Sequence, residues 1–123
     1  MPASPELAGF IRDHFKSVWS LELLLLLMRD PTLSWKREQL VAALRASDSV
    51  VATSMESLIA GGLIIRDKAE LTRYSPANAE LDRLARETDA LYASKPDAVR
   101  RLIVSNAGLG LTAFADAFKL KRD

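Results

Sequence analysis

The chain lacks cysteine and has one histidine, His14, among its 123 residues. Without cysteine there is no disulfide, no thiolate nucleophile and no cysteine-ligated metal. A zinc site would depend almost entirely on carboxylates, which zinc sites rarely do, and no motif places His14 beside a serine as a catalytic triad requires. We therefore expect no metal, no cofactor and no enzymatic activity, and we interpret His14 as a surface or hydrogen-bonded helix residue.

An excess of one charge is also lacking, because 17 basic residues face 16 acidic ones and the formal net charge is +1. Whole-chain charge therefore gives no argument for nucleic acid, and a basic patch would have to be local. The most hydrophobic stretch, "LELLLLLMRD", is shorter than the roughly 18 apolar residues that a membrane span needs. The first residues carry acids and an aromatic where a signal peptide needs a basic start and an apolar run. We expect a cytoplasmic protein with no membrane partner.

What the chain does have is 49% hydrophobic residues, enough for the core of one compact domain. The pattern predicts an N-terminal helix within 1–17, a central domain over 18–76 and a C-terminal helical extension over 77–123. Ser4 with Pro5 predicts the first helix start, and Pro31 predicts the end of the helix that begins at Ser17. The two outer segments are candidates for dimerisation.

The central segment predicts two short helices and a hairpin. Ser34 is the expected N-cap of "WKREQLVAALRA", Asp48 is the expected cap of the next helix, and Gly61-Gly62 is its expected end. "LIIRDKAELTRYS" predicts two strands around a charged turn. Ser75-Pro76 then predicts another helix start, followed by a helix through Tyr92, a helix from "SKPDAVRRLIVSN" and an amphipathic segment over 111–118. The fold class is mainly α with a small β-hairpin.

The stretch "WKREQLVAALRASDSVVATSMESLIAGGLIIRDKAELTRYSPA" resembles the winged helix-turn-helix domain of bacterial transcription regulators of the MarR/ArsR/PadR kind. The resemblance implies a supporting helix in "LVAALRAS", a recognition helix over about 49–60 and a wing over about 63–75, with N- and C-terminal helical extensions. It implies a recognition helix in the major groove of double-stranded DNA and a wing on the backbone or minor groove. A non-enzymatic transcriptional regulator is the function that follows.

The expected recognition helix contains two acids, Asp48 and Glu56, and no base. Its short polar side chains can bond phosphates or base edges, so the candidates for DNA contact on this helix are Ser49, Thr53, Ser54 and Ser57. Phosphate neutralisation would then depend on its basic neighbours, which are Lys36, Arg37, Arg45, Arg66, Lys68 and Arg73. Ordinary solvated surface charge is the competing interpretation of these six residues.

Two questions stay open at this stage. The low charge of the 47–62 segment also suits a protein partner, so a protein-interaction module on the same scaffold, as an adaptor or antagonist, is the alternative function. The helix after Ser17 is apolar on nearly all sides and must be covered by neighbours or by a second subunit. We expect a homodimer, with Leu24, Phe114 and Phe118 at its interface.

Overall fold

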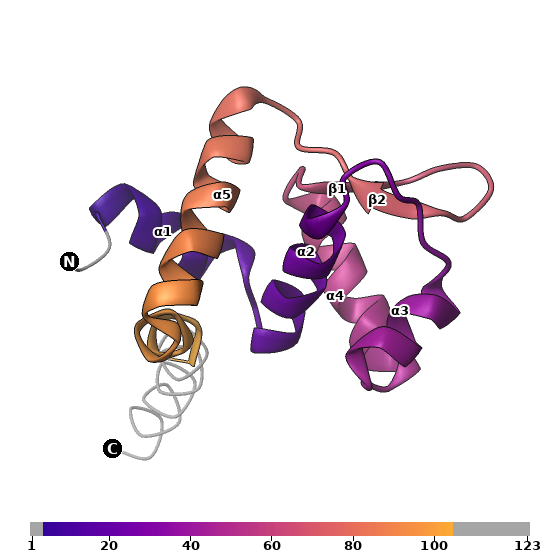
Figure 1. Ribbon diagram of the computed structural model, residues 1–123, viewed down its shortest axis with the longest axis horizontal. Coiled ribbons are helices and arrows are strands. Elements are labelled where there is room, and N and C mark those ends of the chain that lie inside the picture. Colours follow the sequence, from indigo (N-terminus) through magenta and orange to yellow (C-terminus); the bar gives the residue numbers. More distant parts are fainter. Residues whose placement is uncertain (1–3, 105–123) are drawn as a thin grey trace, which may run out of the picture.

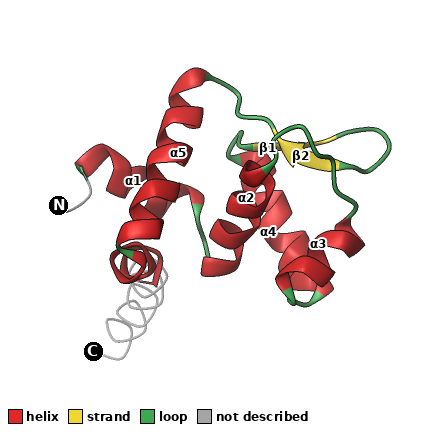
Figure 2. Ribbon diagram, viewed as in Figure 1, coloured by secondary structure: helices red, strands yellow, loops and turns green. Residues whose placement is uncertain are grey.

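A computed structural model describes residues 4–104 of the chain (Figure 1). In chain order its elements are α1 (Pro5–His14), α2 (Val18–Arg29), α3 (Arg37–Leu44), α4 (Asp48–Ala60), β1 (Ile64–Arg66), β2 (Thr72–Tyr74) and α5 (Ala79–Ser94), and the chain is helical again over 96–104. The prediction of a mainly helical fold with a small antiparallel hairpin is confirmed (Figure 2). No helix among the described residues is long and apolar enough to cross a membrane.

The helices are arranged around α2, which lies in the middle of the molecule (Figure 1). On one side α1 packs against α5, and on the other α2 packs against α4 and α3, with the hairpin beyond them. A single cluster of buried apolar side chains runs from Leu7 in α1 to Ile103 in the last helical segment. The N-terminal helix and the described part of the C-terminal extension therefore share one core with the central segment.

The first helix begins where its cap predicts, and the second begins at Val18, one residue after the predicted Ser17. The Ser4 hydroxyl accepts a hydrogen bond from the backbone N–H of Leu7, with Pro5 in the first helical position. Ser17 caps α2 by the same kind of bond to Ser20, and Pro31 follows the end of that helix.

Three other helix starts differ from the prediction, and two differ for one reason. The backbone N–H and C=O of Trp35 both pair with Thr72 at 2.8 Å, so the chain stays extended there and α3 begins at Arg37 with Lys36 rather than Ser34 as its N-cap. Ser75 and Ala77 likewise donate to the carbonyls of Leu63 and Gly62, so α5 begins only after Asn78. Pairing with the sheet therefore overrides a local cap signal.

The third difference lies at α4, where Ser47 caps the helix and Asp48 is its first helical residue. The expectation that Leu24 lies at a dimer interface is wrong, because its side chain is 0% exposed within the single chain. The apolar surface of α2 is covered largely by α4, α3 and β2 of the same molecule. Phe114 and Phe118, the other two expected interface residues, and the amphipathic segment over 111–118 lie outside the described residues.

The hairpin is tied to α5 as well as to α4. The Tyr74 hydroxyl donates to the Asp82 carboxylate at 2.6 Å, and Asp82 also accepts two bonds from the Arg86 guanidinium. Burial raises the pKa of Tyr74, and the hydrogen bonds from Tyr74 and Arg86 lower the pKa of Asp82. These contacts fix the base of the hairpin while its turn extends away from the core.

Candidate nucleic-acid interface

α4 divides into a buried stripe and an exposed stripe. Val51, Met55 and Leu58 are at most 2% exposed and pack on the core, as their spacing predicts. Ser49 and Thr53 are exposed, and Ser57 is half-buried. The side chains available to a partner on this helix are therefore short and mostly uncharged.

Ser54 does not belong to the exposed stripe. It is only 4% exposed, because it follows Val51 by three residues and precedes Leu58 by four, which places it on the buried face of α4. A side chain in that position cannot reach a base, so its assignment as a DNA contact is wrong.

The two ends of α4 are held by specific local contacts. At the start, the Ser47 hydroxyl accepts from the backbone N–H of Val50 and lies 3.3 Å from the Ser49 hydroxyl. At the end, Gly62 has a φ of +77°, and a Cβ added at Gly61 would come within 2.8 Å of the His14 ring. His14 stacks on Phe10 in α1 and bonds to its carbonyl, which confirms its interpretation as a hydrogen-bonded helix residue.

The turn of the hairpin is ordered by Asp67. Its carboxylate accepts from the backbone N–H groups of Ala69 and Leu71, and its own N–H donates to the Leu71 carbonyl. Glu70, with a φ of 65°, supplies the left-handed residue that closes the turn. Lys68 is thereby displayed on a defined turn rather than on a loose loop.

Both acids of α4 pair with basic residues that were expected to contact DNA. The Arg37 guanidinium lies 2.9 Å from the Asp48 carboxylate, and the Arg66 guanidinium lies 3.0 Å from the Glu56 carboxylate. Arg66 also lies 3.4 Å from Glu70. These pairs bring the start of α3 and the hairpin next to α4, and they reduce the positive charge that Arg37 and Arg66 offer to an anion.

Three predicted basic residues converge on one hollow. Lys36, Arg37 and Arg66 line it together with Glu38 and Glu70, and its volume is about 330 Å³. Both acids and bases thus line its walls.

Four of the six expected basic residues form no ion pair with any described residue. These are Lys36, Arg45, Lys68 and Arg73. Arg73 alternates with buried Thr72 and Tyr74 on β2, so it lies on the face of the hairpin that is turned from the core. The unpaired cations therefore surround α4 from the turn before it, the start of α3 and the hairpin.

Arg45 has an uncommon backbone conformation. It ends α3 with φ 54° and ψ 39°, the left-handed region that a glycine or asparagine normally occupies at a helix C-terminus. A non-glycine residue there costs about 1 kcal/mol. An exposed arginine occupies the turn between α3 and α4 in spite of that cost.

The charge on this face is mixed rather than positive. Between residues 36 and 73 the chain carries six bases and five acids, and no continuous basic stripe follows from that balance. Sequence reasoning missed both ion pairs, because Arg37–Asp48 and Glu56–Arg66 join different elements and helical spacing reports only pairs within one helix.

No group of three or more metal-binding side chains occurs within residues 4–104. Comparisons with protein-family models, with curated proteins and with solved structures found no significant match to this chain.

Proposed function

We propose that this chain is a winged-helix transcriptional regulator that binds double-stranded DNA without enzymatic activity. α4 is the recognition helix in this proposal, and the β1–β2 hairpin is the wing. The observation that carries it is the exposed stripe of short polar side chains on α4, flanked by cations that no described acid neutralises.

The proposal assigns different work to the two kinds of residue. Thr53 and Ser49 contact base edges or phosphates from α4, where hydroxyls act as donors or acceptors and the threonine methyl fits a thymine methyl. Arg45, Lys68 and Arg73 neutralise phosphates, which supplies sequence-independent affinity and fixes the register. Arg37 and Arg66 hold α3 and the hairpin against α4 through their pairs with Asp48 and Glu56.

The strained backbone of Arg45 supports this assignment. Glycine would occupy that conformation without cost, so arginine at this position lowers stability relative to glycine. A guanidinium at the turn before α4 is placed to meet a phosphate as the helix enters a groove.

The homodimer is part of the proposal, with Phe114 and Phe118 of the C-terminal extension as its contacts. Two copies would present two α4 helices to successive half-sites. Light scattering at high protein concentration measures this directly, and a monomer there would remove the dimer from the proposal.

A direct test is fluorescence-anisotropy titration of the full chain against a pool of mixed genomic DNA fragments, at low and at moderate salt. Binding that weakens steeply with salt is expected, since each neutralised phosphate contributes roughly 0.9 to the slope of log affinity against log salt. No binding even at low salt would contradict the proposal.

A second function is favoured by the charge balance. Six bases and five acids over 36–73 make a face that suits a mixed protein surface better than a polyanion. On this alternative α4 and the hairpin dock a protein partner, as an adaptor or antagonist does. Steep salt dependence with DNA would count against it, because that behaviour requires phosphate contacts.

A further inference from the structure

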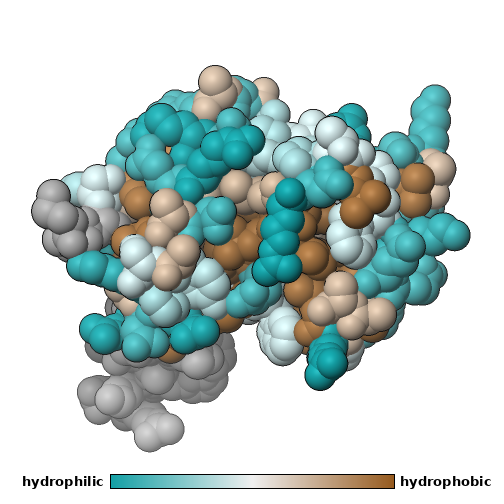
Figure 3. Space-filling model, viewed as in Figure 1, coloured by the Kyte–Doolittle hydropathy of each residue, from teal (hydrophilic) through white to brown (hydrophobic). Residues whose placement is uncertain are grey.

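α2 and α3 line a hollow that includes no residue of α4. Its volume is about 330 Å³, near the lower end for small-molecule sites. Apolar walls come from Val18, Leu26 and Leu44, and Trp19 stands beside them with 42% of its surface exposed. Figure 3 shows hydrophobic surface gathered over α2 in the middle of the molecule, between the hydrophilic surfaces of α5 and the hairpin.

One carboxylate, that of Glu22, lies in the wall of this hollow. Glu22 is half-buried, and one carboxylate oxygen accepts a hydrogen bond from the Tyr92 hydroxyl at 2.7 Å. No described Lys, Arg or His lies within 4.0 Å of it. The one described group that bonds this carboxylate is the neutral Tyr92 hydroxyl, which itself accepts a hydrogen bond from the Arg100 guanidinium at 3.3 Å. The other carboxylate oxygen is not engaged by any described residue.

We propose that this hollow binds a small organic cation with an apolar body, such as a primary arylalkyl amine. The ammonium group lies between Glu22 and Trp19, which share one face of α2 because they are three residues apart. The carboxylate supplies a charge-assisted hydrogen bond, and the indole supplies a cation–π contact. The apolar body packs on Val18, Leu26 and Leu44.

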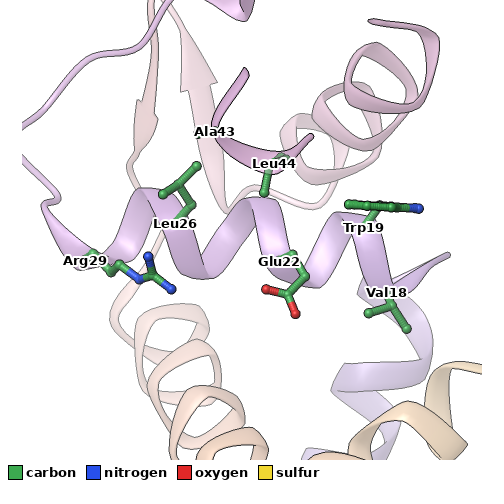
Figure 4. A pocket seen from close by; sticks show the side chains of 7 residues that line it. All are labelled: Val18, Trp19, Glu22, Leu26, Arg29, Ala43 and Leu44. Atoms are coloured by element: carbon green, nitrogen blue, oxygen red, sulfur yellow. The ribbon is translucent and has the colours of Figure 1, made fainter. Parts of the chain in front are cut away.

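Arg29 sets the direction and the charge of the ligand. It lines the same hollow seven residues after Glu22, and Figure 4 shows both charged side chains on the same side of α2. Seven residues separate the two backbone positions by about 10 Å along a helix, and the Arg29 side chain extends from its position towards Glu22 (Figure 4). A second positive group would meet Arg29, and the site therefore favours a monocation over a diamine.

The proposed cation site does not depend on DNA binding. It uses the α2 face that contains Trp19 and Glu22, whereas the proposed DNA contacts use α4, the turn at Arg45 and the hairpin. Failure of either proposal leaves the other intact.

The experiment is a titration of the isotopically labelled full chain followed by two-dimensional amide NMR. The probes are 2-phenylethylammonium, neutral 2-phenylethanol and anionic 3-phenylpropionate, which present similar apolar bodies with different charge. We expect saturable shifts at 18–29 and 43–44 with the ammonium, at about millimolar affinity or tighter. The alcohol should bind at least about fivefold more weakly, and the anion should not saturate.

Two variants and one control locate the cation. Glu22→Gln keeps an acceptor for Tyr92 but removes the charge, so ammonium affinity should fall about tenfold while alcohol affinity stays the same. Trp19→Leu should lower ammonium affinity about threefold. Glu38→Gln removes the same charge from α3 outside this hollow and should change nothing.

Three results would overturn the proposal: equal affinity for ammonium and alcohol, undiminished ammonium binding by Glu22→Gln, or shifts centred elsewhere. Dispersed spectra of the free variants check that each is folded.

Discussion

α2 and α4 pack against each other, yet they distribute their side chains in opposite ways. α2 buries Leu21, Leu23, Leu24 and Leu27 completely, and these point in several directions around the helix. α4 buries one stripe and leaves Ser49, Thr53 and Glu56 exposed. A helix that is covered around most of its circumference serves the core, whereas one with a polar exposed stripe has a face free for a partner.

The comparison explains why the apolar richness of α2 does not by itself indicate a dimer interface. The apolar surface of a helix must be buried, but hydrophobicity alone does not indicate whether the same chain or a second subunit buries it. The intramolecular contacts of α2 with α4, α3 and β2 answer this for Leu24. Conversely, the phase of the buried stripe of α4, rather than its composition, marks the exposed surface, because Thr53 is exposed while its neighbour Ser54 is buried.

The largest expected effect, on the free energy of unfolding, comes from shortening a buried side chain of α2. Leu24→Ala should lower the free energy of unfolding by about 2–5 kcal/mol, since it removes a fully buried side chain and leaves a cavity. Chemical denaturation of both proteins measures the difference. Leu26→Ala, at a half-buried position of the same helix, is the matched control and should cost less.

A dimer role for Leu24 would give a different result. Unfolding stability would then depend on protein concentration, and Leu24→Ala would shift the molecular mass in light scattering rather than the stability of the monomer.

The second effect tests the face around α4. Changing Arg45, Lys68 and Arg73 together to Ala should weaken DNA binding about a hundredfold at low salt and reduce the salt slope by roughly 3, because three phosphate contacts are lost. Anisotropy titrations at several salt concentrations give both values. Lys36 is kept because it is the N-cap of α3.

The charge-matched control is the triple change of Lys16, Arg29 and Arg101 to Ala, which lie on the α1–α2 connection, at the end of α2 and on the helical segment 96–104. Equal losses from the two triple variants would mean that net charge alone drives binding and that α4 has no special part in it.

Much of the local structure around α2 and α4 could be predicted from the sequence. Within residues 4–104, the helices, the hairpin, the glycine end of α4 and its buried stripe follow from local spacing and turn chemistry, and the structure confirms them. The start of α3 and that of α5 could not be predicted this way, because they depend on pairing of Trp35, Ser75 and Ala77 with residues distant in the chain. Helix starts are local signals only where no strand competes for the same backbone groups.

In the candidate site, too, local features could be predicted from the sequence and contacts between elements could not. The exposure of Ser49 and Thr53 follows from helical period, and the burial of Ser54 follows from the same period once the phase of α4 is fixed by Val51 and Leu58. The neutralisation of Arg37 and Arg66 depends on how three elements meet, which no local pattern reports.

The third effect separates neighbouring positions on α4. Thr53→Ala should reduce affinity for a selected DNA site about tenfold, because it removes one hydroxyl hydrogen bond, worth roughly 0.5–1.5 kcal/mol, together with the methyl contact at a base edge. Ser54→Ala should leave DNA affinity unchanged, since Ser54 is buried. Competition titrations with the selected site and with unrelated DNA measure specificity separately from bulk affinity. A larger loss from Ser54→Ala than from Thr53→Ala would contradict the phase of α4.

The smallest effect concerns the acid that faces the hairpin. Glu56→Gln removes the partner of Arg66 at 3.0 Å and leaves Glu70 at 3.4 Å, so the guanidinium gains freedom to meet a phosphate. DNA affinity should rise about two- to threefold, while the stability change stays within about 1 kcal/mol because the pair is on the surface. Glu80→Gln on α5 is the control with the same charge change.

The direction of that change distinguishes the two proposed functions. The affinity for a polyanion rises when an acid is removed from the exposed stripe of α4, because electrostatic repulsion falls and Arg66 loses its ion-pair partner. A protein partner fitted to a mixed surface loses a complementary charge when Glu56 is replaced. A rise in DNA affinity would mean that Glu56 lowers phosphate binding in the unmodified protein. No change would mean that the Glu56–Arg66 pair serves only to hold the hairpin against α4.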